Sequence, residues 1–156
     1  MSKTNINILI IEDNEQKKNS AVSKLNEVVD SLISKLFINL EFFRVTSYKE
    51  FQELFNEKGT QFFDGYIIDM QFPLFPDGPI KPECGLNILM DLEFNLVGTP
   101  ACVFSSDDFS KKLIRSKNYT NQFILYRELS ELDGFGLFLE NVLNYKNKKD
   151  NFLHKM

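Results

Sequence analysis

The sequence has no tryptophan, one histidine and two cysteines among its 156 residues, and these scarcities argue against several kinds of site. His154 lies near the C-terminus, and Cys84 and Cys102 lack the spacing of paired metal ligands. We therefore expect neither a zinc site nor a cysteine–histidine nucleophile. Long apolar runs of the ~20 residues needed to span a membrane are also missing, as is the basic-then-apolar order of a signal peptide, so we expect a cytoplasmic protein without membrane contact.

The overall charge is also informative, because the net value of −4 gives no sign of direct nucleic-acid binding. Lys146, Lys148 and Lys149 form a small basic cluster that is typical of a solvated C-terminus. Hydrophobic residues make up 43% of the chain, enough for a single core. We expect one domain over residues 1–145, followed by a polar C-terminal tail over residues 146–156.

Short apolar runs alternate with helical patterns along the chain. The runs cover residues 6–11, 40–45, 66–68, 101–104 and 123–125, and they have the composition of parallel strands buried on both faces. Between and after them, apolar residues recur at steps of three and four, as in Phe135, Phe138, Leu139, Val142 and Leu143. This alternation predicts a doubly wound α/β fold: a five-stranded parallel sheet with helices on both faces.

Residues 71–85 interrupt this rhythm with four of the five prolines in the chain. Prolines lack an amide donor and restrict the residue before them, so the segment predicts a long, irregular and stiff loop. The apolar residues of this loop either form a partner-binding surface or pack onto the domain itself, and both interpretations stay open here. They are Phe72, Leu74, Phe75 and Ile80.

Polar residues follow the apolar runs at the positions where an α/β sheet binds ligands, outside the carboxyl ends of its strands. Glu12 and Asp13 end the first run, Asp69 ends the third, and Ser105 ends the fourth. Packed carboxylates repel one another, and a hard cation such as Mg²⁺ relieves that repulsion. Acidic residues at such positions also cap helices, but Asp69 precedes the proline-rich loop and has no helix to cap.

These segments, in their order and spacing, resemble the receiver domains of two-component response regulators over residues 6–145. The segments are ILIIEDN (8–14), FDGYIIDMQFP (63–73), GLNIL (85–89) and PACVFSS (100–106). The resemblance implies a flavodoxin-like sheet with strand order 2-1-3-4-5 and Asp69 as the phosphoacceptor. It further implies Mg²⁺ held by Glu12, Asp13 and Asp69, Ser105 in contact with the phosphoryl group, and Phe123 as an aromatic switch residue.

The sequence departs from the family pattern at the end of the fifth run, where the family has a Lys-Pro pair. Depending on the alignment, Tyr126 or Arg127 takes the lysine position, and an arginine fork differs from a lysine point charge. The proline-rich loop is also about eight residues longer than the connection usual in the family.

Three functions are consistent with these features. The first is a stand-alone receiver that accepts a phosphoryl group on Asp69 from a histidine kinase or phosphotransfer protein and signals to a downstream protein. The second is a pseudo-receiver that binds proteins without phosphorylation, and the third is an unrelated metal-dependent phosphatase. For the stand-alone receiver, any enzymatic activity is limited to self-phosphorylation and dephosphorylation at Asp69. The sequence leaves the oligomeric state, including a homodimer, undecided.

Overall fold

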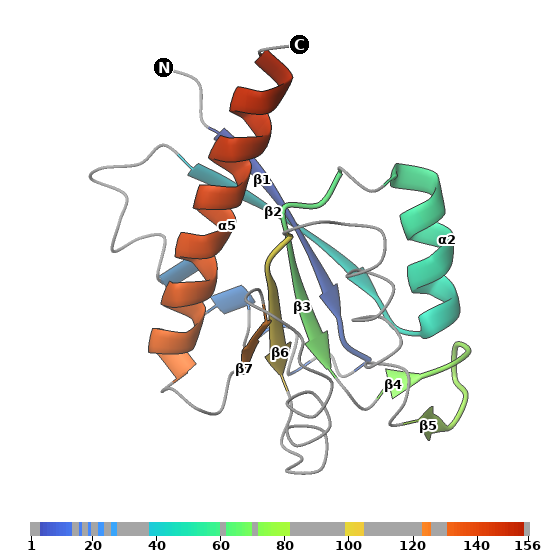
Figure 1. The fold of residues 1–156 in the computed structure, drawn as a ribbon. Helices are drawn as coiled ribbons and strands as arrows, with labels where there is room; N and C mark the ends of the chain where they lie inside the picture. The colour runs from blue at the N-terminus through green and yellow to red at the C-terminus, as the bar shows by residue number, and fades with distance from the viewer. Residues whose placement is uncertain are drawn as a thin grey trace.

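The structure, a computed structural model, describes residues 4–13, 16, 19, 22–23, 26–27, 38–59, 62–69, 72–81, 99–104, 123–125 and 131–154. Figure 1 shows a central sheet with helices on either side. The described residues between the first two strands, from Gln16 to Glu27, are helical. The named elements are β1 (Thr4–Ile11), β2 (Ile38–Val45), α2 (Tyr48–Lys58), β3 (Gly65–Asp69), β4 (Phe72–Pro73), β5 (Ile80–Lys81), β6 (Ala101–Phe104), β7 (Phe123–Leu125) and α5 (Glu131–His154).

Five strands form one parallel sheet in the order β2-β1-β3-β6-β7. Counted along the chain, leaving aside the short β4 and β5, this is the predicted order 2-1-3-4-5, so the predicted fold class is confirmed. The fourth and fifth predicted runs match β6 and β7 residue for residue, and β2 begins at Ile38 instead of residue 40. All five strands point the same way, so their carboxyl ends share one edge of the sheet (Figure 1).

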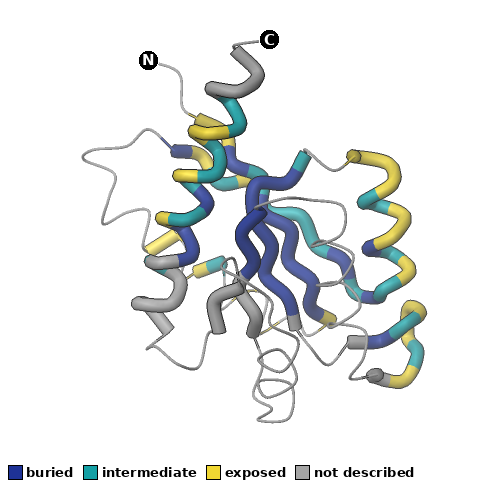
Figure 2. The backbone as a smooth tube through the Cα atoms, in the orientation of Figure 1, coloured by how far each residue is buried: buried dark blue, intermediate teal, exposed yellow. Residues whose placement is uncertain are grey.

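Alternate residues of the central strands pack against the two helical layers, which explains why these strands are apolar throughout. On one face Leu9 and Ile11 join a cluster that includes Phe51 of α2. On the other face Ile8 and Ile10 join Phe138 and Val142 of α5. The strands are the most uniformly buried part of the molecule in Figure 2, with α2 and α5 covering opposite faces.

Phenylalanine fills much of the layer between the sheet and α2. The Phe43 ring makes edge-to-face contacts with Phe62 and Phe63, at centroid distances of 5.3 Å and 5.5 Å. Such edge-to-face pairs satisfy the ring quadrupoles and contain no polar atom that needs a partner. Ring packing therefore holds much of this part of the core.

The turn from β2 into α2 is held by side-chain caps. Ser47 is the N-cap, and its hydroxyl accepts a hydrogen bond from the Glu50 amide at 3.2 Å. The Glu50 carboxylate in turn accepts a hydrogen bond from the Thr46 hydroxyl at 2.6 Å. The first contact satisfies a backbone donor that the first turn of a helix leaves open, and the second ties the residue after β2 to that turn.

The prediction of a wholly irregular loop over residues 71–85 is wrong, because β4 and β5 pair there as an antiparallel hairpin. The Gly78 amide donates to the Phe75 carbonyl at 3.0 Å, and Asp77 has a φ of 60° within that turn. The hairpin is attached to α2, where the Lys49 amide donates to the Leu74 carbonyl at 3.0 Å. Strands of two residues are too short to produce a pattern in the sequence, and the prolines conceal them.

The prediction that the basic cluster belongs to a solvated tail is wrong for two of its three lysines. Helix α5 continues past residue 145 to His154. The side chains of Lys146 and Lys149 are 21% and 9% exposed and pair with a buried carboxylate, whereas Lys148 is exposed. The reason is that positions 142, 146 and 149 share one face of the helix, and this face turns toward the sheet. In the described part of the chain, no helix has both the length and the apolar character to cross a membrane.

Candidate functional site

The strand register brings the predicted acidic residues to neighbouring positions on the carboxyl edge of the sheet. Ile11 of β1 pairs with Ile68 of β3, so Glu12 and Asp69 are the next residues on adjacent strands. Strands in a sheet lie about 4.8 Å apart, which sets the scale of their backbone separation. On its other side Asp69 pairs with Phe104, the last residue of β6, and Ser105 follows in the sequence.

Glu12 and Asp13 occupy different environments although they are consecutive. The β1–β2 ladder extends to Glu12, whose amide donates to the Val45 carbonyl at 3.2 Å. Glu12 is only 3% exposed, whereas Asp13 is exposed. Carboxylates are rarely buried to this extent, and this burial distinguishes Glu12 from the exposed Asp13.

Arg44, near the carboxyl end of β2, contacts the backbone of both acidic residues. Its Nε donates to the Glu12 carbonyl at 3.0 Å, and its Nη2 donates to the Asp13 carbonyl at 2.9 Å. Sequence reasoning did not identify Arg44 as a site residue. The signal was an arginine inside an otherwise apolar stretch, FFRV, one residue before the end of the strand.

Several predicted site residues lie outside the described part of the structure. These are Ser105, Tyr126 and Arg127, together with the side chains of Asp69, Phe123 and Phe72, whose backbones belong to β3, β7 and β4. Their proposed roles stay predictions. Phe75 is described, and its side chain is 55% exposed on the β4–β5 hairpin.

The donor set at this edge fits a small, hard cation. Glu12, Asp13 and Asp69 offer carboxylate oxygens, which Mg²⁺ and Mn²⁺ prefer over nitrogen or sulfur. The buried carboxylate of Glu12 would gain from a neighbouring positive charge. The described side chains contain no cluster of three acidic, histidine or cysteine residues, but the side chain of Asp69 is not part of that set.

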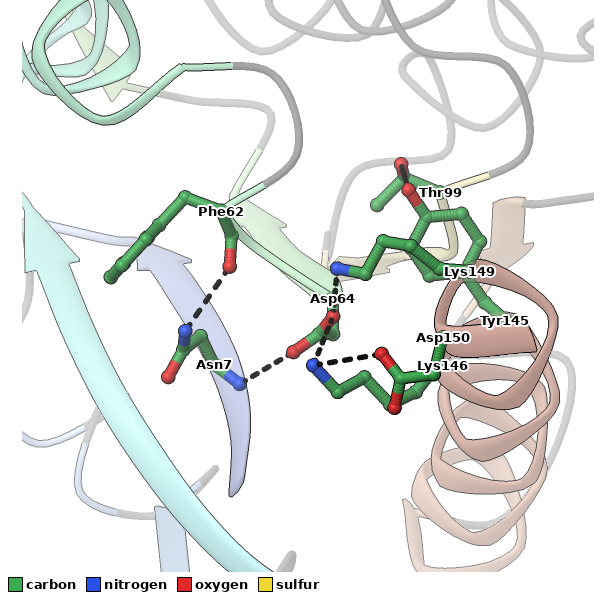
Figure 3. A network of polar contacts seen from close by, with 8 residues as sticks. All are labelled: Asn7, Phe62, Asp64, Thr99, Tyr145, Lys146, Lys149 and Asp150. Carbon is green, nitrogen blue, oxygen red and sulfur yellow. Dashed lines mark hydrogen bonds and ion pairs between the residues drawn. The ribbon is translucent and has the colours of Figure 1, made fainter. Parts of the chain in front are cut away.

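A second polar cluster lies at the opposite, amino edge of the sheet, around the fully buried Asp64 (Figure 3). The Asn7 amide donates to Asp64 Oδ2 at 2.9 Å, and the Asp64 amide donates to the Asn7 carbonyl at 2.8 Å. From α5, Lys149 Nζ hydrogen-bonds Asp64 Oδ1, and Lys146 Nζ lies 3.8 Å from the same oxygen. This ion-pair cluster joins the C-terminal half of α5 to β1 and β3.

Tyr66, the second residue of β3, is fully buried and belongs to the hydrophobic cluster that includes Phe51 of α2. Burial raises the pKa of Tyr66 well above its ordinary value, and the neighbouring Tyr145 and Asp64 raise this pKa further. The Tyr66 hydroxyl has no hydrogen-bond partner among the described residues. By contrast, the Tyr145 hydroxyl accepts a hydrogen bond from Thr99 Oγ1 at 3.0 Å.

No protein-family model and no curated protein sequence matches this chain. Solved structures do match: a two-component response regulator from Cytophaga hutchinsonii has a TM-score of 0.61 and 15% identity, over 91% of this chain and 98% of that one. The phosphorylated cyanobacterial phytochrome response regulator RcpA has a TM-score of 0.50 and 15% identity, covering 98% and 97%. The Mn²⁺-bound form of the response regulator Rcp1 has a TM-score of 0.51 and 16% identity, covering 85% and 88%.

The strand order and the placement of the helices define a doubly wound, flavodoxin-like α/β domain. Within that class, the structural matches show that the chain has the fold of the receiver domains of response regulators. The resemblance stated from the sequence is thereby confirmed at the level of the fold. At identities of 15% and 16% the likeness concerns the fold alone.

Proposed function

We propose that this protein is a receiver module that accepts a phosphoryl group on Asp69 and signals through contacts with other proteins. The observation that carries the proposal is the register of β1 against β3, which makes Glu12 and Asp69 neighbours at the carboxyl edge of the sheet. The receiver fold supports it. Two structural neighbours also support it, because one is a phosphorylated response regulator and the other is a Mn²⁺-bound one.

In this proposal a carboxylate oxygen of Asp69 attacks the phosphorus of a phosphohistidine on a kinase or phosphotransfer protein. A phosphorus–oxygen bond forms, the phosphorus–nitrogen bond breaks, and the imidazole leaves with the bonding electron pair. Glu12, Asp13 and Asp69 hold Mg²⁺, whose positive charge offsets the repulsion among the carboxylates and the phosphoryl oxygens when it is bound. Ser105 and either Arg127 or Tyr126 contact the phosphoryl group, and Phe123 responds to its presence.

The test is to incubate the protein with Mg²⁺ and acetyl phosphate and to measure the intact mass. We expect a mass increase of one phosphoryl group that Asp69→Asn abolishes, because the amide lacks the nucleophilic oxygen charge. Asp77→Asn is the matched control, since Asp77 is an exposed carboxylate in the hairpin turn and asparagine tolerates its positive φ. Persistence of the adduct in Asp69→Asn would place the modification at another residue.

A second function, a pseudo-receiver that binds a protein without phosphorylation, is favoured by one specific observation. Phe75 stands exposed at the start of a turn whose backbone is held by a hydrogen bond, so its docking would order little additional chain. If no adduct forms and no divalent cation binds, this function replaces the first. Steady hydrolysis of phosphoesters would instead indicate a phosphatase.

A further inference from the structure

Among the described residues, hydrogen bonds from Glu12 to β2 and from Arg44 of β2 fasten the acidic pair after β1. One is the backbone bond from the Glu12 amide to the Val45 carbonyl at 3.2 Å. The guanidinium of Arg44 donates two more, to the Glu12 carbonyl at 3.0 Å and to the Asp13 carbonyl at 2.9 Å. The amide and the carbonyl of Glu12 are therefore both hydrogen-bonded to β2, the edge strand of the sheet.

An arginine is suited to this position for a geometric reason. β1 ends at Ile11, and the guanidinium of Arg44 supplies donors to the next two carbonyl oxygens along the chain. The planar guanidinium carries several donors in a fixed fork and can bond two oxygens at once, which a lysine ammonium on a flexible stem does not do with the same geometry. The contact thus fixes the direction of the backbone from which both acidic side chains project.

We propose that Arg44 is a positioning residue for the divalent-cation site, holding Glu12 and Asp13 in the geometry that binds the metal. The inference rests on the proposed function, because it assumes that this edge of the sheet binds Mg²⁺ or Mn²⁺. Arg44 acts through the backbone of the metal-binding residues and does not itself contact the ion. Groups that orient metal ligands in this way typically contribute 10- to 100-fold to metal affinity.

The charge of Arg44 has the opposite effect on metal affinity, and this makes the proposal testable. The guanidinium carries a positive charge, so it repels a divalent cation nearby. If charge were the main effect, removing Arg44 would tighten metal binding. If positioning is the main effect, as we propose, removing it weakens binding in spite of the lost repulsion.

The experiment measures Mn²⁺ affinity by electron paramagnetic resonance in the wild type, Arg44→Ala and Arg44→Lys. We expect Arg44→Ala to bind Mn²⁺ about tenfold or more weakly, in the range of other ligand-orienting groups. Arg44→Lys, which keeps the charge but loses the fork, should recover only part of this loss. Lys49→Ala is the control for removal of one positive charge, because Lys49 is exposed on α2, and its affinity should stay within about twofold of the wild type.

The possible failures are distinguishable. If the wild type binds no Mn²⁺, the proposed metal site is wrong, whatever Arg44 does. If the wild type binds and Arg44→Ala binds as tightly or more tightly, the site stands and the positioning role is overturned. Hydrogen exchange without metal checks the cause: Arg44→Ala should speed exchange at the Glu12 amide and leave the central amides of β3 unchanged.

Discussion

The hydroxyl of Tyr66 is a buried polar group without a hydrogen-bond partner among the described residues. We predict that Tyr66→Phe leaves the free energy of unfolding at pH 7 unchanged or raises it by about 1 kcal/mol, because it removes an unsatisfied group and keeps the ring. Urea denaturation measures this. Tyr145→Phe is the comparison, since its hydroxyl is bonded to Thr99 and its loss should cost about 1 kcal/mol.

The same residue predicts a dependence on alkaline pH. Burial raises the pKa of Tyr66 in the folded state, so below pH ~10 both folded and unfolded chains keep the proton and the residue contributes no pH dependence. Above pH ~10 the unfolded chain releases the proton and the folded protein does not, so stability falls by up to about 1.4 kcal/mol per pH unit. Tyr66→Phe should remove this part of the decline. An identical decline in both proteins between pH 10 and 11 would contradict the assignment.

At the scale of whole elements, the ion pair between Asp64 and Lys149 fastens α5 to the sheet. We predict that Lys149→Met lowers the free energy of unfolding by about 3 kcal/mol, because it leaves a buried carboxylate with less compensation. The loss stays at the low end of the range for such pairs, since Lys146 remains 3.8 Å from the same oxygen. Thermal or urea unfolding measures the change.

Two further variants separate the pair from the helix that carries it. Lys148→Met, at an exposed position of α5, should change stability by less than about 0.5 kcal/mol. The double variant Asp64→Asn with Lys149→Met should lose less stability than the sum of the two single variants. In the double variant both charges of the pair are gone, so neither charge is left buried without the other. Additive losses would show that the two side chains do not interact in solution.

At the scale of the whole molecule, the sheet and α5 approach each other closely at Gly65. A Cβ atom built there would lie 2.7 Å from Val142 Cγ2 and 2.9 Å from Phe138 Cζ, both on α5. Gly65→Ala therefore forces side chains in α5 to shift, and we expect a loss of about 1–3 kcal/mol, as for other overpacked cores. Gly136→Ala is the matched control. Gly136 lies on α5, and a Cβ atom built there would meet nothing within 4 Å. It should be neutral or slightly stabilising.

The sequence predicts the strands because each strand is a short apolar run that is followed by polar residues, as Ile11 is by Glu12, and the resemblance to receiver domains implies their order. It predicts the carboxyl edge as the site for the same reason. Arg44 is missed because its role depends on β2 lying beside β1, a contact between residues more than 30 positions apart. Lys149 is missed likewise, since only the fold brings it to Asp64, 85 positions away.

Asp64 and Gly65 are consecutive, and both contact α5 from the amino end of β3. The ion pair holds Lys149 in the C-terminal half of the helix and the tight packing holds Phe138 and Val142 nearer its middle, while the helix begins at Glu131, toward the carboxyl edge (Figure 1). The 18 residues between Glu131 and Lys149 measure about 27 Å along the helix axis. A rigid rod of this length acts as a lever: a tilt of about 5° about Lys149 would displace Glu131 by about 2 Å, at the end of the helix that lies toward the carboxyl edge of the sheet.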